Sequence, residues 1–425
     1  MKMSKGTRRG ALLLTSMAAM ASAGLTASPA ASGATVVTMK MTTVGTAAGL
    51  TQVISQYEKQ NPNIQIDVTA IPSNTYQPTV RTELAGGNGP DIMFVWGGSG
   101  NAMAVGEVAP TGDLAPLNGA PWISELPNTA KHLFEVRGGV YAATLDYGVG
   151  AFFYNKAVFK RAHITVPATF KELLSSCSSL RKIGVTPMAL GNEVAYLNFQ
   201  IPVIFADDII YSQDPNFGQK LASGKITLAQ SKLWKQAVLT GNQEYAQLFS
   251  HHCIQPNSTS TTDTEAIADV ANGSAGMTTL LSAYQELNQD NPKGDFASFE
   301  APALNTPGKI VVTLDPGLSF AVNQHSQYKS QAKQFLAYLM KPSVVSYLAA
   351  QSDSIPNVSS SGFTVPGIFN GLKPLINHGK TAEYPTNYFT NYNTKLTWEA
   401  EAEDIATGSA SPLAATRAVL KTFSG

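Results

Sequence analysis

Strand-like and helix-like segments alternate through the first hundred residues, and this alternation restricts the fold more than any other feature. The runs 34–44, 64–71 and 91–96 are apolar or alternate apolar with polar residues, as strands do. Between them, apolar residues recur at helical spacing in 50–57 and 78–85. Strands that alternate with helices form a mostly parallel sheet that is covered on both faces. The sequence therefore predicts an α/β fold.

The chain is too long for one ordinary hydrophobic core. It has 425 residues, whereas a single core rarely serves more than about 250 to 300 residues. We therefore expect two lobes. No long low-complexity linker divides the chain, which indicates that the chain crosses between the lobes more than once.

A glycine-rich turn leads into the run 91–96, and an aromatic residue ends that run. Gly89-Pro90-Asp91 closes the turn, and Trp96 precedes a pair of glycines. In α/β folds, ligands bind beyond the carboxyl ends of the strands. This stretch therefore suggests binding before it suggests catalysis.

The charge balance argues against several classes of partner. Lys and Arg together number 29, as do Asp and Glu, so the formal net charge is zero. A neutral chain is a poor match for nucleic acid or an anionic membrane surface as its main partner. Charged residues make up only 14% of the chain. This composition suits an exported protein with a neutral polar ligand.

The N-terminal residues have the pattern of an export signal. A basic segment precedes the short apolar run 11–21, and Ala21-Ser22-Ala23 matches a cleavage site, with a second candidate near Ala30 to Ser32. The run is too short to span a membrane, and no Cys follows it to carry a lipid. Arg8-Arg9 offers a twin-arginine signal as an alternative, but the residues after it match that pattern poorly. We therefore expect Sec-dependent export, loss of the signal and a soluble mature protein. The basic residues are Lys2, Lys5, Arg8 and Arg9.

The two cysteines, Cys177 and Cys253, leave two readings open. Export permits a disulfide between them, while Cys177 also suits the apolar face of a helix as a small buried side chain. His251-His252-Cys253 looks like part of a metal site, but no second ligand pair stands at metal-site spacing. We expect no metal and no cofactor.

Several motifs, in this order along the chain, resemble the extracellular solute-binding proteins of ABC importers, in the sugar-binding branch that is similar to maltose-binding protein. Gly89-Pro90-Asp91-Ile92 resembles the turn G-P-D-[IV] of that family. Val166 to Leu174 is similar to P-x-T-W-x-E-L, with Phe170 in place of Trp. Further similar stretches are 57–64, 106–114, 136–145 with 153–156, 273–277, 332–340 and 408–420.

The resemblance implies a type II periplasmic-binding-protein fold, in which hinge strands join two lobes and the ligand lies in the cleft. It implies a signal and the start of the mature chain in 1–33, a first lobe in 34–145 plus about 305–345, and a second lobe in 146–304 plus about 346–425. It further implies a monomeric carbohydrate receptor that closes on its ligand by hinge motion and delivers it to the membrane permease of an ABC importer. We expect the receptor in the periplasm, with a secreted or surface-associated protein as the alternative.

Sugar chemistry selects the candidate ligand-binding residues. A sugar offers CH-rich faces to aromatic rings and hydroxyl groups to carboxylates and amides. We looked for such side chains at strand ends, at the expected lobe crossings and in loops beside glycines. The candidates are Trp96, Asp146, Tyr147, Asn192, Glu193, Tyr196, Tyr284, Asp315 and Tyr392.

Each candidate has a structural alternative. Trp96 also suits a core position, and Asp146-Tyr147 with the following glycine suits a solvated turn. Tyr284 falls near the place of a Trp that the family has after the position of Met277, and it also fits the face of a helix. The alternatives are a surface loop for Asn192 and a plain turn for Asp315. Tyr388, Tyr392 and Trp398 form an aromatic cluster from which one ring is a candidate to close the cleft, and helix packing is the alternative for Trp398.

Other functions remain open at this point. The same fold binds other solutes, such as polyamines or metal chelates. An exported polysaccharide hydrolase would need a pair of carboxylates, for which Asp146 and Glu193 are available. No G-x-S-x-G, H-E-x-x-H or phosphate-binding G-x-x-x-x-G-K-[ST] motif occurs in the chain. We therefore expect a receptor with no catalytic residues.

Overall fold

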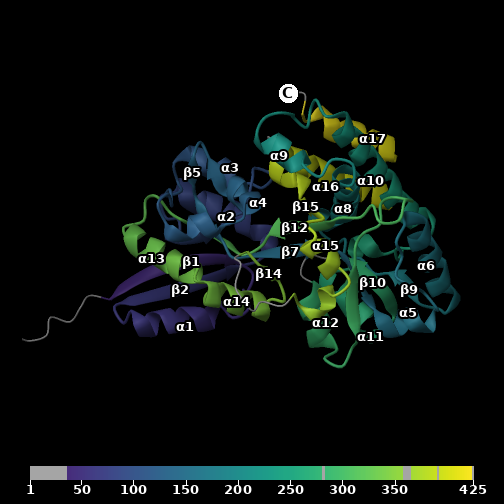
Figure 1. Cartoon of the computed structure of the whole chain (residues 1–425), viewed down its shortest axis with the longest axis horizontal. Coiled ribbons are helices and arrows are strands. Elements are labelled where there is room, and N and C mark those ends of the chain that lie inside the picture. Colours follow the sequence, from purple (N-terminus) through teal and green to yellow (C-terminus); the bar gives the residue numbers. More distant parts are fainter. Residues whose placement is uncertain (1–35, 280–282, 358–364, 390–391, 424–425) are drawn as a thin grey trace, which may run out of the picture. The chain divides into compact units, whose positions relative to one another are not determined.

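The computed structural model describes residues 36–279, 283–357, 365–389 and 392–423 (Figure 1). Val36–Gly425 form one compact unit. The expected signal of residues 1–33 lies outside the described residues. Within the described part of the chain, no helix combines the length and the apolar character that a membrane span requires.

The first sheet has the strand order β2-β1-β3-β13-β6. β1 (Val37–Val44) pairs in parallel with β2 (Ile64–Ile71) and β3 (Ile92–Phe94). β13 (Ser319–Val322) runs antiparallel to β3 and to β6 (Ala142–Thr144). The strands predicted from the first hundred residues are confirmed. β13 comes from a segment far beyond β6 in the sequence, so the chain leaves this sheet after β6 and returns to it later.

Helices cover both faces of the first sheet. α1 (Leu50–Gln60), α13 (Lys329–Leu339) and α14 (Pro342–Gln351) share one core with Ile92. α2 (Ser73–Ala85) and α3 (Val105–Val108) share another core with Met93. The neighbours Ile92 and Met93 belong to different cores because successive strand side chains point to opposite faces. The expected doubly covered sheet is therefore present.

The second sheet has the order β11-β8-β10-β9. β8 (Phe152–Asn155) is antiparallel to β10 (Ala275–Thr279) and β11 (Phe296–Phe299), while β9 (Thr186–Met188) is parallel to β10. The hydrophobic core around this sheet includes the buried side chains of α6 (Phe170–Lys182), α8 (Gln200–Tyr211) and α10 (Lys232–Ser250). The Thr169 hydroxyl accepts a hydrogen bond from the Glu172 backbone N–H and thereby caps the start of α6.

The third sheet has the order β14-β7-β12-β15. Its strands are β14 (Ile355–Pro356), β7 (Asp146–Gly150), β12 (Val312–Pro316) and β15 (Thr381–Glu383). Val149 and Val312 pack in one core with α11 (Asp263–Asn272). The third sheet therefore belongs with the second sheet rather than the first.

Shorter elements complete the described chain. Further helices are α4 (Asn128–Lys131), α5 (Lys156–Arg161), α7 (Ala195–Asn198), α9 (Phe217–Ala222), α12 (Ala283–Asp290), α15 (Lys373–Asn377), α16 (Tyr392–Thr407) and α17 (Pro412–Lys421). β4 (Glu135–Val136) and β5 (Gly139–Val140) form a small ribbon. Short 3₁₀ turns include η3 (His132–Phe134) and η6 (Pro385–Tyr388).

Sheet membership divides residues 36–423 into two lobes, which we call the first lobe (36–145 and 318–351) and the second lobe (146–316 and 355–423). The sequence places the return to the first lobe at about 305–345. In the structure β12 joins the third sheet, and α14 extends the core of the first lobe to Gln351. The runs on either side of Gly317 look alike in the sequence, and a local pattern does not show which sheet each one joins.

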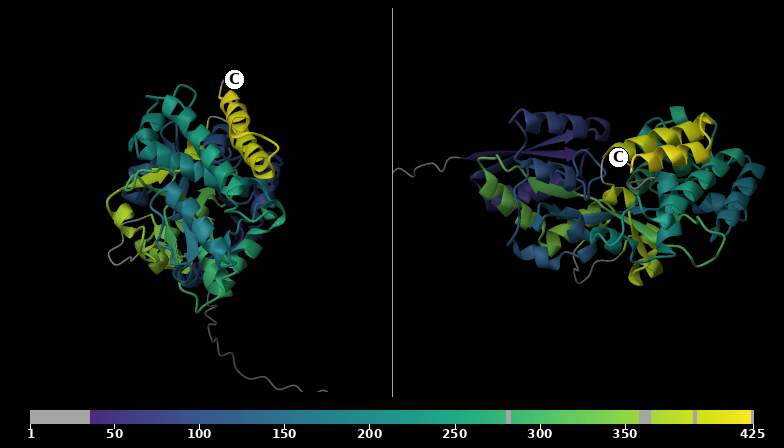
Figure 2. Two further views of the ribbon diagram at one scale, coloured as in Figure 1. Left: turned by 90° about the vertical axis from the view of Figure 1, so that its right-hand side faces the viewer. Right: turned by 90° about the horizontal axis from the view of Figure 1, so that it is seen from above.

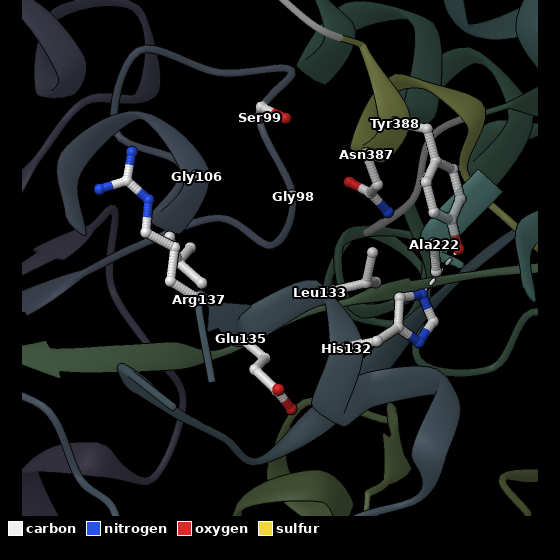
Figure 3. Close-up of a pocket in the computed structure, with 11 residues that line it drawn as sticks. Gly98, Ser99, Gly106, His132, Leu133, Glu135, Arg137, Ala222, Asn387 and Tyr388 are labelled. Atoms are coloured by element: carbon white, nitrogen blue, oxygen red, sulfur yellow. Dashed lines mark hydrogen bonds between the residues drawn. The ribbon is translucent and has the colours of Figure 1, made fainter. Parts of the chain in front are cut away.

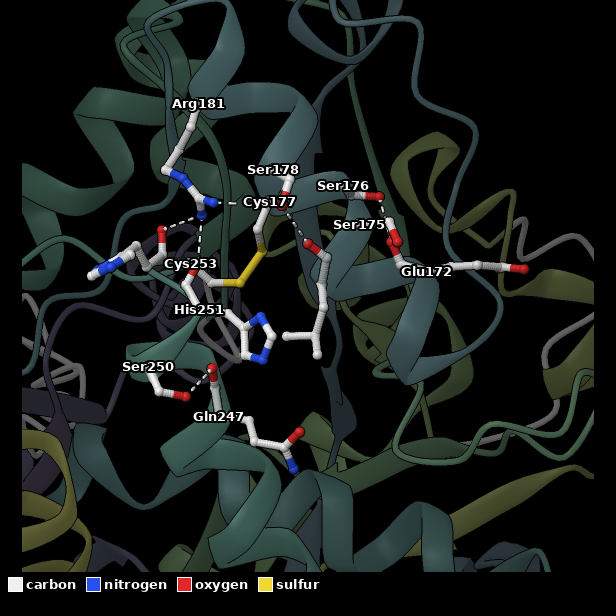
Figure 4. The surroundings of a disulfide bond; sticks show 12 residues. Glu172, Ser175, Ser176, Cys177, Ser178, Arg181, Gln247, Ser250, His251 and Cys253 are labelled. Atoms are coloured by element: carbon white, nitrogen blue, oxygen red, sulfur yellow. Dashed lines mark hydrogen bonds between the residues drawn. A yellow bond between two sulfur atoms is a disulfide. The ribbon is translucent and has the colours of Figure 1, made fainter.

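A disulfide joins two parts of the second lobe (Figure 4). Cys177 of α6 bonds to Cys253, which follows α10, and their Cα atoms lie 5.1 Å apart. Both cysteines are fully buried. Cys177 is therefore both disulfide-bonded and a small buried side chain of α6, which were the two alternatives that the sequence left open. Arg181 donates hydrogen bonds to the backbone oxygens of His251 and His252. Among the described residues, no group of His, Cys, Asp and Glu is arranged to hold a metal ion.

Candidate ligand-binding site

A cavity of about 700 Å³ is lined by residues of both lobes. Its first-lobe wall comes from α2, β3 and the loop after β3, and its second-lobe wall comes from α7, α16 and the end of β12. Its aromatic lining residues are Phe94, Trp96, Tyr196, Phe199, Tyr384 and Tyr392. Its polar lining residues are Ser73, Asn74, Gln77, Asn101, Gln200, Asp263, Asp315, Thr386, Lys395 and Glu399.

Trp96 stands at the point where the third strand of the first lobe ends. Its backbone closes the following loop, because Trp96 N donates to Met103 O at 3.2 Å and Val105 N donates to Trp96 O at 2.9 Å. Its ring packs edge-on against Phe94 and Tyr76, with centroid distances of 4.7 Å and 5.7 Å. The indole is half-buried. Neighbouring rings thus hold it in place and leave part of its surface in the cavity.

A chain of polar side chains crosses the cavity from one lobe to the other. Gln77 of α2 and Lys395 of α16 both donate to the side-chain oxygen of Asn101, at 3.4 Å and 2.6 Å. The Lys395 ammonium also lies 3.5 Å from a carboxylate oxygen of Glu399, one helical turn along α16. These groups are present on both walls and already bond one another. A polar ligand would exchange these partners for its own.

Burial favours the neutral forms of the Lys395 and Glu399 side chains. Burial lowers the pKa of Lys395, and the nearby Glu399 carboxylate offsets part of that shift. Burial also raises the pKa of Glu399, and Lys395 offsets part of that rise. Each group therefore supports the charged form of the other. Such a pair suits a ligand that hydrogen-bonds to both of them.

Asp315 lies in the cavity near the end of β12. Asn387 donates a 3.0 Å hydrogen bond to its carboxylate. Burial raises the pKa of Asp315 to about 6, while Asn387 and Lys395 act in the opposite direction. At neutral pH the carboxylate is therefore mostly ionised and can accept hydrogen bonds from a ligand.

The structure brings some of the sequence-predicted candidates together. Trp96, Tyr196, Asp315 and Tyr392 all line the cavity. They come from the loop after β3, from α7, from β12 and from α16, which lie far apart in the sequence. Tyr284 lies in α12, and its side chain is outside the described residues.

Asp146 lies instead where the chain crosses between the lobes. Its carboxylate accepts hydrogen bonds from the Leu318 backbone at 2.6 Å and from the hydroxyl groups of Ser354 and Ser352. The crossings from β6 to β7, from β12 to β13 and from α14 to β14 therefore all meet at Asp146. Gly317 is required beside it, because a Cβ atom there would lie 2.4 Å from a carboxylate oxygen. These contacts tie the lobe crossings together at Asp146, and it does not line the cavity.

The remaining candidates also lie away from the cavity lining. Tyr147 pairs with Pro316 and Ile355 within the third sheet. Asn192 is buried and donates to the Tyr245 hydroxyl at 3.1 Å. Glu193 is exposed, and its backbone N–H donates to Thr261 O at 3.1 Å. The carboxylates of Asp146 and Glu193, the pair considered for hydrolysis, are not brought together in the cavity.

Much of the polar lining of the cavity was not among the candidates that the sequence predicted. Lys395 and Glu399 have the i, i+4 spacing of an ordinary surface ion pair on a helix, and that spacing does not show that they are buried. Gln77 has no distinctive pattern around it. Asn101 did carry a usable signal, because it lies in the glycine-rich loop directly after Trp96.

Comparison with known proteins places the chain in a family. The family model for bacterial extracellular solute-binding proteins matches residues 42–345, which is well over half of the chain. This chain belongs to the bacterial extracellular solute-binding proteins. Membership identifies an exported binding protein, and it confirms the family resemblance of the sequence motifs.

Individual relatives of this solute-binding protein are distant. A multiple sugar-binding protein from Streptococcus mutans is 24% identical over 294 residues, covering 69% of this chain and 68% of that protein. A structure from work on xylan utilization by Caldanaerobius polysaccharolyticus has a TM-score of 0.76 at 17% identity and covers 91% of this chain and 100% of its own. RafE in complex with raffinose has a TM-score of 0.74 at 18% identity, with coverage of 91% and 99%. The structural matches confirm the expected two-lobe α/β fold.

Proposed function

We propose that this solute-binding protein captures a sugar or oligosaccharide in the cavity between its lobes and delivers it to the permease of an ABC importer. The observation that carries the proposal is the composition of the cavity. Aromatic rings from both lobes surround amide and carboxylate groups. This combination suits a ligand with apolar CH faces and a rim of hydroxyl groups. The sugar-binding relative and the raffinose complex support the same class of ligand.

The proposal assigns roles to individual side chains. The rings of Trp96, Tyr196 and Tyr392 pack against sugar faces. Asp315 accepts hydrogen bonds from sugar hydroxyl groups, and Asn101 offers both an acceptor and a donor. The lobes close around the ligand by rotation at the crossings near Asp146. The protein works outside the cytoplasm as a monomeric receptor, without a cofactor and without a catalytic step.

A polyamine is the main competing ligand. Asp263, Asp315 and Glu399 line the cavity and would attract a cation. Lys395 lies among them and lines the same cavity, 3.5 Å from Glu399. An ammonium group at this place repels a second cation and occupies a carboxylate. The arrangement therefore favours a neutral polyhydroxyl ligand.

A thermal-shift screen of the mature protein tests the proposal. The ligands are mono- and oligosaccharides, with spermidine, amino acids and ferric citrate as controls. A ligand that binds only the folded state raises the midpoint, and we expect one group of sugars to do so. Trp96→Ala should remove the shift, whereas Leu413→Ala, at an exposed position of α17, should retain it. A shift with spermidine or ferric citrate alone, or breakdown of the sugar, would overturn the proposal.

A further inference from the structure

The lobes touch each other directly beside the ligand cavity. The loop 97–101 of the first lobe meets η6 of the second lobe, where Ser99 N donates to Asn387 O at 3.2 Å. A Cβ atom at Gly98 would lie 1.9 Å from Asn387 O, and one at Gly100 would lie 2.0 Å from Thr386 O. Glycine at both positions thus allows the two backbones to approach this closely.

A second hollow, of about 440 Å³, adjoins the same contact (Figure 3). Gly98, Ser99 and Asn387 line it, whereas the ligand cavity is lined by Trp96 and Thr386 from the same two segments. Contacts in the second hollow therefore lie outside the ligand cavity, but they join the same two segments of the two lobes.

In the second hollow a histidine of the first lobe meets a tyrosine–glutamate pair of the second lobe. His132 Nε2 lies 2.7 Å from the Tyr388 hydroxyl and 3.1 Å from a carboxylate oxygen of Glu383. Figure 3 shows the His132 imidazole pointing toward Tyr388. Among the described residues, His132 with Glu383 is the pairing of a basic with an acidic side chain that joins the two lobes as defined above. Lys395–Glu399, in contrast, lies within α16.

The second-lobe half of this contact is complete within its own lobe. The Tyr388 hydroxyl donates to Glu383. Gly218 of α9 packs beside both groups, because a Cβ atom there would lie 2.7 Å from the Tyr388 oxygen and 2.8 Å from Glu383 Oε2. The Tyr211 hydroxyl lies at the same place. Elements of one lobe thus hold the pair in position, and His132 is the component that leaves when the lobes separate.

We propose that His132 is a positioning residue for lobe closure. Its contact with Tyr388 and Glu383 stabilises the arrangement in which Ser99 meets Asn387 and the cavity walls are brought together. It touches no ligand, yet it raises ligand affinity because the apparent affinity scales with the fraction of molecules in the competent arrangement. The link to affinity rests on the proposed function, whereas the effect on closure does not.

Distance measurements on the ligand-free protein test the closure step. Because the native cysteines are bonded to each other, Val68→Cys in the first lobe and Val166→Cys in the second provide exposed sites for spin labels. In the labelled, ligand-free parent, we expect a measurable population of closed molecules at a short interlobe distance. His132→Ala should reduce the ratio of closed to open molecules roughly fivefold, which corresponds to about 1 kcal/mol. Tyr388→Phe should shift the ratio in the same direction. In the double variant, the change in the free energy of closure should be smaller than the sum of the changes in the two single variants.

The matched control is His325→Ala. His325 also faces a carboxylate, at 3.7 Å from Asp113, but both residues lie in the first lobe. This control should leave the distance distribution unchanged, and the melting temperatures of all variants should stay close to the parent. Unchanged distributions in both His132→Ala and Tyr388→Phe, or a parent without a closed population, would overturn the inference. Neither result depends on a sugar, so failure here is distinct from failure of the proposed function.

Discussion

The ammonium group of Lys395 donates a 2.6 Å hydrogen bond to the side-chain oxygen of Asn101 and thereby joins the two walls of the ligand cavity. Lys395 belongs to α16 of the second lobe, and Asn101 belongs to the loop after Trp96 in the first lobe. Both side chains line that cavity. Under the proposed function, ligand binding and lobe contact therefore use the same side chains.

Removing the Asn101 side chain should weaken binding. Asn101→Ala takes away the acceptor for both Lys395 and Gln77, and we expect about a tenfold loss of affinity, as for a hydrogen bond to a charged group. Titration calorimetry with the sugar that gives the strongest thermal shift measures it. Asn118→Ala is the control, because Asn118 bonds only backbone groups of Gly138 and Val140 in the first lobe. Equal affinity of Asn101→Ala and the parent would contradict this role.

Affinity should depend on pH through Asp315. Its pKa in the ligand-free protein is raised to about 6 by burial, so the carboxyl group is mostly protonated at pH 5 and mostly ionised at pH 7. If sugar hydroxyl groups donate to the carboxylate, affinity should rise about tenfold over this range, following the ionised fraction. Asp315→Asn should bind more weakly and with a flat profile. A slope that persists in Asp315→Asn would assign the titration to another group.

Stability should fall as the pH rises through the range set by Glu244. This residue is buried, and burial raises its pKa from 4.5 to about 9. The folded protein therefore keeps a proton that the unfolded chain releases above pH 4.5. The free energy of unfolding should decrease from about pH 4.5 to pH 9 and level off above that. Glu244→Gln should gain on the order of 1 to 3 kcal/mol over the parent at pH 8.

Urea unfolding at pH 5 and pH 8 measures this difference. Glu403→Gln, at an exposed position of α16, should follow the parent at both values. If the difference in unfolding free energy between Glu244→Gln and the parent is the same at pH 5 and at pH 8, Glu244 does not cause the pH dependence of stability.

A methyl group at Gly98 should keep the lobes apart. The Cβ of Gly98→Ala would overlap Asn387 O at 1.9 Å, and the backbone φ of +65° adds strain. We expect at least a tenfold loss of ligand affinity and a shift of the labelled protein to longer interlobe distances. Gly112→Ala is a close control, because φ is +85° there and no atom lies within 4 Å of the added Cβ. Similar losses of ligand affinity in Gly98→Ala and Gly112→Ala would show that backbone strain alone causes the effect.

Loss of the disulfide should lower stability without changing binding. Cys177→Ala with Cys253→Ala removes a bond that closes a loop over a sequence separation of 76 residues. We expect a loss of about 2 to 4 kcal/mol in the free energy of unfolding. Affinity at 20 °C should stay at the parental value, because neither cysteine lines the cavity. A large loss of affinity in a still-folded variant would contradict this separation.

Local patterns in the sequence predicted several elements of the first lobe. The alternation in 64–71 and the helical spacing in 50–57 depend only on neighbouring residues, and both elements are confirmed. The strand predicted over 91–96 is shorter in the structure, because β3 ends at Phe94, and Trp96 lies two residues beyond it and lines the cavity. A strand end at the edge of an α/β sheet is a place that chain order alone can indicate.

Tertiary structure decided the roles that depend on distant segments. The sequence offers Asp146 as a ligand acceptor or as part of a solvated turn, but the Leu318 backbone and the Ser354 hydroxyl, from later parts of the chain, donate to its carboxylate. The i, i+4 spacing of Lys395 and Glu399 gives no sign of burial, but Asn101, nearly three hundred residues earlier, accepts a hydrogen bond from Lys395 in the cavity.

The sequence by itself determined the alternation of strands and helices in the first hundred residues, the family resemblance and the choice of Trp96 as a candidate, because each follows from short-range order along the chain. Which carboxylate ties the lobe crossings together and which lysine enters the cavity depends on the segments that fold against it. Burial and hydrogen bonding set the chemistry of such a group, and both arise only when those segments meet.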